Sequence, residues 1–320
     1  MTEFKSLTAR ECAERLLAID DPTVCAHVRP DGDAVGSMTA LAEIFRQLGK
    51  PARILPAKDT PERLDFLTEG IEKTDCALGT TLVSVDTASP SQLGEIYEKQ
   101  IPVLSIDHHK VNTPYCDNYT LPDSSSAGET LYRVVEELEA MGRLTLTKPI
   151  AQRLYAAIAS DTGGFVFSNA TESTYRIAAR LVSVGIDHAE INRRLFLSKG
   201  EEQIRAEGYA ALNLKTAKNG LITYLVLSKS ERDALALPFG AFETAIDVVR
   251  GLRGSEIAFV LKETDDGKFK ASIRSVSENV AEIAARHSGG GHVRAAGCTI
   301  EAENIEKASE ILLSELTELI

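Results

Sequence analysis

The sequence predicts an α/β fold: a parallel sheet with helices on both faces, followed by a smaller α+β domain. Three observations lead to this prediction. Short β-branched or apolar runs alternate with helical segments through the first half of the chain, which is typical of a covered parallel sheet. Hairpin signals replace this alternation after about residue 190. The length of 320 residues suits two domains, because single hydrophobic cores stop growing near this size.

An amphipathic helix opens the chain. Thr8 and Glu11 are spaced as in a capping box, and apolar residues recur behind them at helical spacing. Strand 23–28 follows, then a Gly/Asp loop, then a helix that starts at Ser37 and stops before Gly49, a residue type common just past helix ends. The remaining expected strands are 52–56, 81–85 and 102–106, and the remaining expected helices lie near 61–68, 90–99, 126–141 and 148–159.

The second part of the chain has a different pattern. Segment 188–210 is charged and helical without a strand, so we expect it to connect a domain 1–187 to a domain 211–320. Two hairpin signals follow, because a turn sequence with glycine separates two apolar runs in each case. The expected strand pairs are Ala211–Lys215 with Leu221–Leu227 and Ile257–Lys262 with Phe269–Ile273, flanked by helices near 230–235, 278–286 and 304–318.

The composition excludes several classes of protein. With 35 basic and 47 acidic residues, the net charge of −12 argues against binding long nucleic acid, which needs a basic face. The five cysteines are scattered, as in reduced cytosolic proteins. The sequence shows no signal-peptide core and no run of roughly 18 apolar residues. We therefore expect a soluble cytoplasmic protein without membrane contact. It could be a monomer or a homodimer, and no motif decides between the two.

Metal-type ligands gather directly after three of the expected strands. In an open parallel sheet, ligands collect outside the carboxyl ends of the strands, so these side chains are expected to meet. Carboxylate and imidazole groups suit Mn²⁺, Mg²⁺ or Zn²⁺. The sequence therefore predicts a two-metal site. The candidate residues are His27, Asp31, Asp33, Asp86, Asp107, His108, His109 and Asp161.

Each of these clusters also has a structural interpretation. The Asp31-Gly32-Asp33 turn could cap a helix, and Asp86 and Asp161 could each be caps after a strand. Asp107-His108-His109 is harder to explain in this way, because three such residues in a row cannot all pack into a core without partners. His188 and His287 stand alone and are left out of the site.

A glycine-rich segment near the end of the chain is a candidate anion site. Gly289, Gly290 and Gly291 precede His292, and glycines let backbone N–H groups approach an anion closely. The alternative is a tight helix-to-strand turn with surface arginines. The residues that could hold an anion here are Arg274, Ser275, Gly289, Gly290, Gly291, His292 and Arg294.

Two further sets of residues have a structural and a functional interpretation. Ser126 and Glu129 are expected to form a capping box, although the serines before them could instead contact a metal-bound phosphate. Aromatic side chains could stack a base, but core packing is the favoured interpretation for most of them. These aromatic residues are Tyr115, Tyr119, Phe165 and Phe167.

Taken in order, the motifs resemble those of the DHH phosphoesterase family. The matching segments are 27–33 with the pattern H-x-x-P-D-G-D, Asp86, 107–109 and 160–163. The segment 289–297 resembles the glycine-rich motif of the family's first associated-domain type. The resemblance covers nearly the whole chain. In length and layout it is most similar to the nanoRNase A-type branch of the family.

The resemblance implies two divalent ions, with Mn²⁺ expected and Mg²⁺ the alternative. It also implies an active site in the cleft between the two domains. The second domain would bind the substrate, with Arg274 gripping a terminal phosphate. Asp107 would orient a histidine ligand. His109 would neutralise charge on the phosphate or protonate the leaving oxygen. One ion would be held by His27, Asp31 and Asp86, and the second by Asp33, Asp86, His108 and Asp161, with Asp86 bridging.

The expected activity is hydrolysis of short RNA or DNA oligonucleotides to mononucleotides, together with removal of the 3′-phosphate of adenosine 3′,5′-bisphosphate (pAp). A phosphodiesterase for linear or cyclic dinucleotides would use the same ions, and the sequence cannot separate these substrates. A nucleotide-binding sensor is the alternative outside the enzymes. It would be expected to lack ligand residues, and none of the expected ones is missing.

Overall fold

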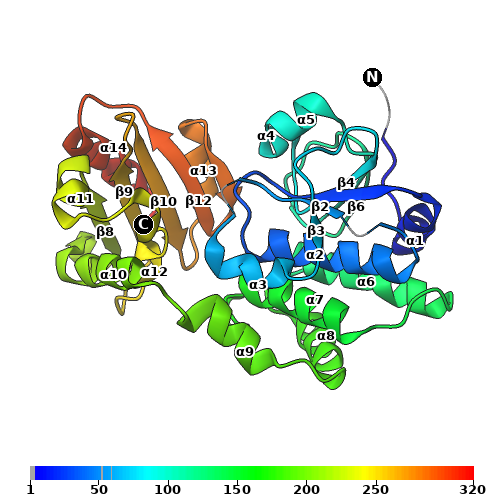
Figure 1. The fold of residues 1–320 in the computed structure, drawn as a ribbon. Helices are drawn as coiled ribbons and strands as arrows, with labels where there is room; N and C mark the ends of the chain where they lie inside the picture. The colour runs from blue at the N-terminus through cyan, green and yellow to red at the C-terminus, as the bar shows by residue number, and fades with distance from the viewer. Residues whose placement is uncertain (1–3, 52, 59) are drawn as a thin grey trace. The chain divides into compact units, whose positions relative to one another are not determined.

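The computed structural model describes residues 4–51, 53–58 and 60–320. It divides into two compact units, of which the first ends at Ser198 and the second spans Lys199–Ile320 (Figure 1). The division falls inside segment 188–210, which the sequence analysis assigned to a connector. The first residue of the expected strand 52–56 lies outside the described residues.

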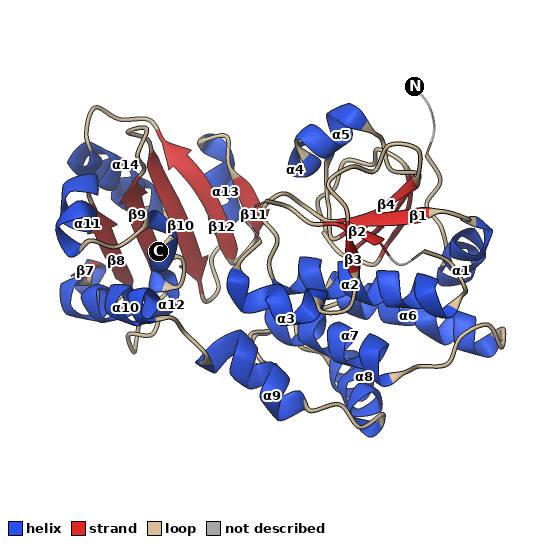
Figure 2. Cartoon of the chain, in the orientation of Figure 1, coloured by secondary structure: helices blue, strands red, loops and turns tan. Residues whose placement is uncertain are grey.

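A six-stranded sheet in the order β3-β2-β1-β4-β5-β6 forms the centre of the first unit (Figure 2). All neighbouring strands are parallel, which confirms the predicted sheet. The prediction missed β3 and β6, because both are short edge strands made mostly of polar residues. The strands are β1 (Pro22–Cys25), β2 (Arg53–Leu55), β3 (Glu72–Lys73), β4 (Thr81–Val85), β5 (Leu104–Asp107) and β6 (Asp117–Thr120).

Helices cover both faces of this sheet, with α2 and α6 on one side and α4 and α5 on the other (Figure 1). Helix α2 starts at Gly32 rather than at the expected Ser37, because Asp31 caps it five residues earlier. The expected helix 90–99 is interrupted at Gly94, whose φ is 54°. The helices are α1 (Ala9–Ala18), α2 (Gly32–Gln47), α3 (Asp65–Thr68), α4 (Pro90–Leu93), α5 (Glu95–Lys99), α6 (Ala127–Ala140), α7 (Lys148–Asp161), α8 (Glu172–Ser183) and α9 (His188–Asn192).

Close packing of α2, α6 and α7 depends on two glycines. A Cβ on Gly36 would lie 2.8 Å from the carbonyl oxygen of Arg153, and a Cβ on Gly128 would lie 2.5 Å from the Cβ of Ala157. Real side chains do not approach this closely, so only glycine lets the helices meet here. This packing brings together two candidate metal ligands, Asp33 in the first turn of α2 and Asp161 at the end of α7. It also places the backbone N–H of Gly128, in the first turn of α6, against the Asp33 carboxylate.

A second six-stranded sheet, in the order β11-β12-β10-β9-β8-β7, forms the second unit. Both predicted hairpins, β7–β8 and β9–β10, are present. Residues 211–213 belong to a helix, however, so the first hairpin strand starts only at Lys215. Strands β11 and β12 were not predicted. The strands are β7 (Lys215–Ala217), β8 (Ile222–Leu227), β9 (Ile257–Glu263), β10 (Phe269–Ser275), β11 (Gly290–His292) and β12 (Ala295–Ile300).

The second sheet has a separate apolar core on each face. One core joins the sheet to α13 and α14, and the other joins β8 and β9 to α10 and α12. Across the described residues, every helix is too short or too polar to span a lipid bilayer. The helices of this unit are α10 (Glu201–Asn213), α11 (Lys229–Leu235), α12 (Ala245–Val249), α13 (Val280–Arg286) and α14 (Ile305–Thr317).

Candidate metal centre

The carboxyl ends of three adjacent strands carry the central candidate residues. Strand β1 is followed by His27, β4 by Asp86, and β5 ends at Asp107 with two histidines behind it. These strands are neighbours in the order β1-β4-β5. Asp86 has a φ of 51°, a left-handed conformation that aspartate adopts more readily than most residues. The chain therefore turns sharply at the end of β4, where the Asp86 carboxylate contacts the histidines.

The first group of potential ligand atoms comes from His27, Asp31 and Asp86, which all lie within 4.8 Å of one another. The Nε2 atom of His27 is 3.4 Å from Oδ2 of Asp86. Asp31 also caps α2, because its Oδ1 accepts hydrogen bonds from the backbone N–H groups of Asp33 and Ala34. Capping occupies Oδ1 and leaves Oδ2 for an ion, so the structural and functional interpretations of this aspartate are compatible.

The second group comes from Asp33, His108 and Asp161. The Nε2 atom of His108 lies 3.7 Å from Oδ2 of Asp33 and 3.7 Å from Oδ2 of Asp161. It also lies 3.6 Å from Oδ1 of Asp86. These distances are too long for hydrogen bonds. They are close to the roughly 3.0–3.5 Å expected between two ligand atoms on one ion with bonds of about 2.1 Å.

Helix α6 holds Asp33 in place. Its carboxylate accepts hydrogen bonds from the backbone N–H of Ala127 at 2.7 Å and of Gly128 at 3.0 Å, and from the hydroxyl of Ser37 at 3.0 Å. These amides belong to the first turn of α6, whose positive dipole end stabilises a carboxylate. The amides that could have held a substrate phosphate therefore bind Asp33.

Only half of the predicted capping box at α6 is correct. Ser126 accepts a hydrogen bond from the backbone N–H of Glu129, as expected. The Glu129 side chain accepts from the backbone N–H of Ser125 rather than from that of Ser126. It also accepts from the hydroxyls of Ser125, Ser173 and Thr174. Buried Glu129 thus ties the loop before α6 to α8.

This network also reaches the candidate metal ligands. The Nδ1 atom of His108 is 3.4 Å from the carbonyl oxygen of Ser124. Asn169 donates one hydrogen bond to the carbonyl of Ser125 and one to that of Asp161 at the end of α7. Asn169 was not predicted from the sequence, and no local pattern marks it. Glu129 was expected only in the helix cap, although this residue also positions the loop beside His108.

The substitution Glu129→Gln is expected to weaken metal affinity by about tenfold, because partners behind metal ligands commonly contribute 10- to 100-fold. An amide cannot accept all of the hydrogen bonds that the carboxylate accepts. Titration of Mn²⁺ into metal-free protein would measure the change. Glu136→Gln, an exposed change on the same helix, is the matched control. Equal affinities of the two variants would contradict a positioning role.

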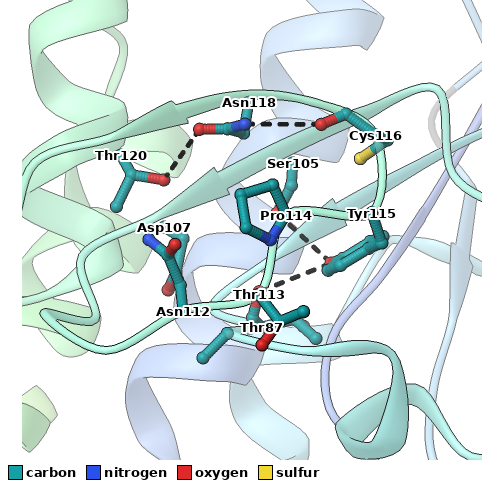
Figure 3. Close-up of a pocket in the computed structure, with 11 residues that line it drawn as sticks. Thr87, Ser105, Asp107, Asn112, Thr113, Pro114, Tyr115, Cys116, Asn118 and Thr120 are labelled. Atoms are coloured by element: carbon teal, nitrogen blue, oxygen red, sulfur yellow. Dashed lines mark hydrogen bonds between the residues drawn. The ribbon is translucent and has the colours of Figure 1, made fainter. Parts of the chain in front are cut away.

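Asp107 contacts His109, which is not one of the two histidines assigned as metal ligands from the sequence. Its Oδ1 is 2.7 Å from Nδ1 of His109. Its Oδ2 is buried and has no hydrogen-bond partner among the described residues. Behind it lies a cavity of about 10 Å³, lined in part by Thr87, Asn112 and Thr120 (Figure 3). That is about the space that one water molecule needs.

Burial opposes protonation of His109, but its hydrogen bond to Asp107 and the nearby charges of Asp107 and Asp86 raise its pKa to about 9. In the protein without metal ions, this histidine is therefore a cation at neutral pH. It lies 3.7 Å from Asp86, beside both groups of potential ligands. A cationic hydrogen-bond donor at this place can neutralise a phosphate oxygen.

The four carboxylates of the site are crowded. Within the described residues of the first unit, Asp33, Asp86 and Asp161 form their ion pairs with histidines. Burial, and then the neighbouring carboxylates, raise the pKa of Asp33 and of Asp161 well above the usual range. For Asp86 the effect of burial is outweighed by His27, His108 and His109, which lower its pKa. Such a donor set fits divalent cations, which supply the missing charge.

Metal binding is expected to release protons. The raised pKa values of Asp33 and Asp161 mean that the metal-free protein retains protons that an ion must displace. The pKa of His27 is also raised, since Asp86 and Asp31 outweigh the effect of its burial. Affinity should therefore fall as the pH decreases toward these raised values. Calorimetric titration of Mn²⁺ in two buffers with different ionisation enthalpies counts the protons, and a count of zero would contradict the expectation.

The candidate substrate residues of the second domain lie together at one end of its sheet. Arg274 pairs with Ala295 across β10 and β12, and the backbone N–H of Ser275 donates to the carbonyl of Arg294. Gly290–His292 form the edge strand β11. A Cβ on Gly289 would lie 2.3 Å from the carbonyl oxygen of Gly297, so close backbone packing requires glycine there whether or not an anion binds.

Two other sets of residues have structural roles. Tyr115 and Tyr119 are only 4% exposed and cannot stack a base. The ring of Phe165 packs between Tyr155 and Tyr175, while Phe167 is 38% exposed. His188 begins α9, and His287 lies 2.9 Å from Glu315, so both lie outside the candidate metal centre.

Comparison with known proteins identifies both parts of the chain. Residues 22–158 match the family model "DHH family, N-terminal domain", and residues 224–318 match the "DHHA1 domain". The chain is 33% identical to the bifunctional oligoribonuclease and PAP phosphatase NrnA of Thermus thermophilus, over 97% of this chain and 93% of that protein. It is 30% identical to the Bacillus subtilis protein of the same name, over 90% and 93%.

Two more distant relatives complete the comparison. The chain is 23% identical to the cyclic-di-AMP phosphodiesterase PdeA of Listeria monocytogenes, over 98% of this chain and 50% of that protein. The structure of an exopolyphosphatase-related protein from Bacteroides fragilis is 22% identical and covers 100% of this chain and 99% of its own, with a TM-score of 0.86. This likeness confirms the predicted fold class.

Proposed function

The chain belongs to the DHH phosphoesterase family, and we propose that it is a two-metal enzyme that hydrolyses short oligonucleotides to mononucleotides and removes the 3′-phosphate of pAp. The arrangement around Asp86 carries this proposal. Its Oδ2 faces His27 of the first ligand group, and its Oδ1 faces His108 of the second. Two adjacent ions require a carboxylate of this kind, which offers one oxygen to each ion. The relatives named as oligoribonuclease and PAP phosphatase support the choice of substrates.

We assign the ligands as the sequence analysis predicted, with Mn²⁺ as the expected metal and Mg²⁺ as the alternative. Two divalent ions would neutralise charge on the phosphate and lower the pKa of the attacking water. The first ion would be held by His27, Asp31 and Asp86, and the second by Asp33, Asp86, His108 and Asp161.

The chain's own residues supply proton transfer and substrate orientation. His109, oriented by Asp107, donates a hydrogen bond to a phosphate oxygen or a proton to the leaving oxygen. In the second domain, Arg274 holds a terminal phosphate and Ser275 assists it. Backbone N–H groups of Gly289, Gly290 and Gly291, with the side chains of His292 and Arg294, hold phosphate or base.

A phosphodiesterase acting on linear or cyclic dinucleotides is the second candidate function. The similarity to PdeA along nearly the whole chain favours it, and the same ligand set would serve. A nucleotide-binding sensor would be expected to have lost ligands, whereas all six predicted ligands lie in the two groups.

A product time course with Mn²⁺ tests the proposal. The substrates are RNA strands from dinucleotide to long oligomer, together with pAp and a cyclic dinucleotide. Rapid loss of the shortest strands and of pAp, with slow loss of long strands, is the expected result. Hydrolysis of the cyclic dinucleotide alone would replace the proposed function by the second candidate.

A further inference from the structure

Three cationic side chains of the second domain surround one aromatic ring. The Nζ atom of Lys262 lies 4.2 Å from the ring centroid of Phe239. The Cζ atom of Arg232 lies 5.5 Å from it, and Nζ of Lys270 lies 6.0 Å from it. The residues come from β9, α11 and β10, and Phe239 begins a short 3₁₀ helix before α12. This cationic cluster is no part of the proposed metal centre or of the glycine-rich segment.

The cluster carries an electrostatic cost that its aromatic and acidic neighbours offset only in part. Lys262 and Lys270 face each other directly across β9 and β10, and like charges in such a pair are destabilising. Lys262 is only 6% exposed. Among the residues the structure describes, no carboxylate forms an ion pair with either lysine. Asp265 pairs with Arg232, and the charge of Glu243 acts on Lys262 only at longer range.

Arg232 adds a second, independent indication of a ligand. The residue is 3% exposed, and its Nη1 atom is buried without a hydrogen-bond partner among the described residues. A buried guanidinium donor without a partner is costly, unless another group comes to accept its hydrogen bond. Phe239 and Lys270 are half-buried, so the cluster opens to solvent on their side.

We propose that Arg232, Lys262 and Lys270 bind a phosphate group of a nucleotide beside the Phe239 ring, which holds the cations together on its face. An anion would neutralise the opposed lysines and accept from the unpaired arginine donor. The arginine offers a planar fork and the lysines offer point charges, a combination suited to phosphate oxygens. Burial, together with the charges of Lys270 and Arg232, lowers the pKa of Lys262 to about 8, which a bound phosphate would reverse.

The position of the cluster indicates which phosphate it binds. Lys270, Ser272 and Arg274 alternate along β10 and therefore lie on one face of the sheet. Their neighbours on β12 are Thr299, Gly297 and Ala295, all of them small. Two residues span about 6.7 Å along a strand, so the backbones of Arg274 and Lys270, four residues apart, are separated by roughly 13 Å. An oligonucleotide held at Arg274 could follow this half-buried strip, and the cluster would then bind a phosphate remote from the one that Arg274 holds.

This assignment rests on the proposed function, but direct binding tests it separately. The metal-free full chain hydrolyses nothing, so affinities for inorganic phosphate, a mononucleotide and a labelled pentanucleotide can be measured at equilibrium. The Lys262→Met/Lys270→Met variant is expected to bind the pentanucleotide at least tenfold more weakly, because it removes two of the three proposed charged contacts. Lys268→Met, an exposed change in the same hairpin, is the matched control and should bind like the natural sequence.

The outcomes of the binding experiment are distinct. The proposal is supported if the double variant loses affinity for the pentanucleotide and the Lys268→Met control does not. Unchanged pentanucleotide affinity overturns it, and so does an effect confined to inorganic phosphate, which would indicate a site for the free anion. Lys270→Gln, a change at a half-buried position, repeats the test if the double variant does not fold.

Kinetics provides the second test. In the double variant, the ratio of KM for the pentanucleotide to KM for pAp should rise about tenfold, because pAp is too short to span the strip. An unchanged ratio contradicts the proposal. If the natural sequence hydrolyses neither substrate, the proposed function fails, while the equilibrium binding of metal-free protein still decides this site.

Discussion

Replacing Asp86 with asparagine is expected to lower kcat for phosphodiester hydrolysis by about 10³-fold or more, because metal stabilisation is worth several kcal/mol and each tenfold in rate corresponds to about 1.4 kcal/mol. Among the described residues, Asp86 is the carboxylate whose two oxygens face histidines of both ligand groups. An amide keeps one oxygen ligand but removes the negative charge and the second oxygen, so the two ions could no longer share it.

Asparagine is the appropriate substitute because Asp86 has a φ of 51°. Asparagine adopts the left-handed conformation readily, whereas Asp86→Ala would add about 1–2 kcal/mol of backbone strain and confuse loss of chemistry with loss of structure. Circular dichroism should show a folded Asp86→Asn protein. Asp123→Asn, an exposed change in the same domain, is the control for the loss of one charge. Hydrolysis retained by Asp86→Asn would rule out the bridging assignment.

Much of this site could be predicted from the sequence, because strand ends determine where it forms. His27, Asp86 and Asp107 each stand directly at or just after an apolar run, and parallel strands bring such ends to one edge. The start of α2 was placed too late for a related reason. Asp31 was considered as a ligand or as a cap, and it caps the helix with one oxygen while its other oxygen remains for the ligand group.

The parts that could not be predicted depend on contacts distant in the sequence. Asn169 joins Ser125 to the end of α7, and the partners of Glu129 include Ser173 and Thr174. No periodicity or spacing marks such pairs. Strand β11 was missed because three residues, two of them glycine, carry no strand propensity and pair only because β12 lies beside them. The active site expected between the domains stays a prediction.

Asp161→Asn is expected to make the metal-free protein more stable and at the same time to reduce strongly its stabilisation by Mn²⁺. Burial and the charges of Asp31 and Asp86 raise the pKa of Asp161. A carboxyl whose pKa is raised by folding contributes stability below its unfolded pKa, and loses that contribution as the pH rises through the folded value. At neutral pH the folded protein must either keep Asp161 ionised among the other carboxylates or protonate it, and both cost stability when no ion is bound. An amide removes this cost.

The expected rise in Tm of metal-free Asp161→Asn is roughly 2–4 °C, the shift that about 1 kcal/mol produces in a domain of this size. The difference from the natural sequence should vanish at acidic pH, where Asp161 is protonated in both states. Added Mn²⁺ should raise the Tm of the natural sequence and of Asp123→Asn. The rise in Tm should be much smaller for Asp161→Asn, because binding stabilises only a protein that holds the ion. A metal-free Asp161→Asn that is less stable than the natural sequence at neutral pH would mean that this carboxylate stabilises the fold. Its crowding beside three other carboxylates would then have a structural rather than a functional cause.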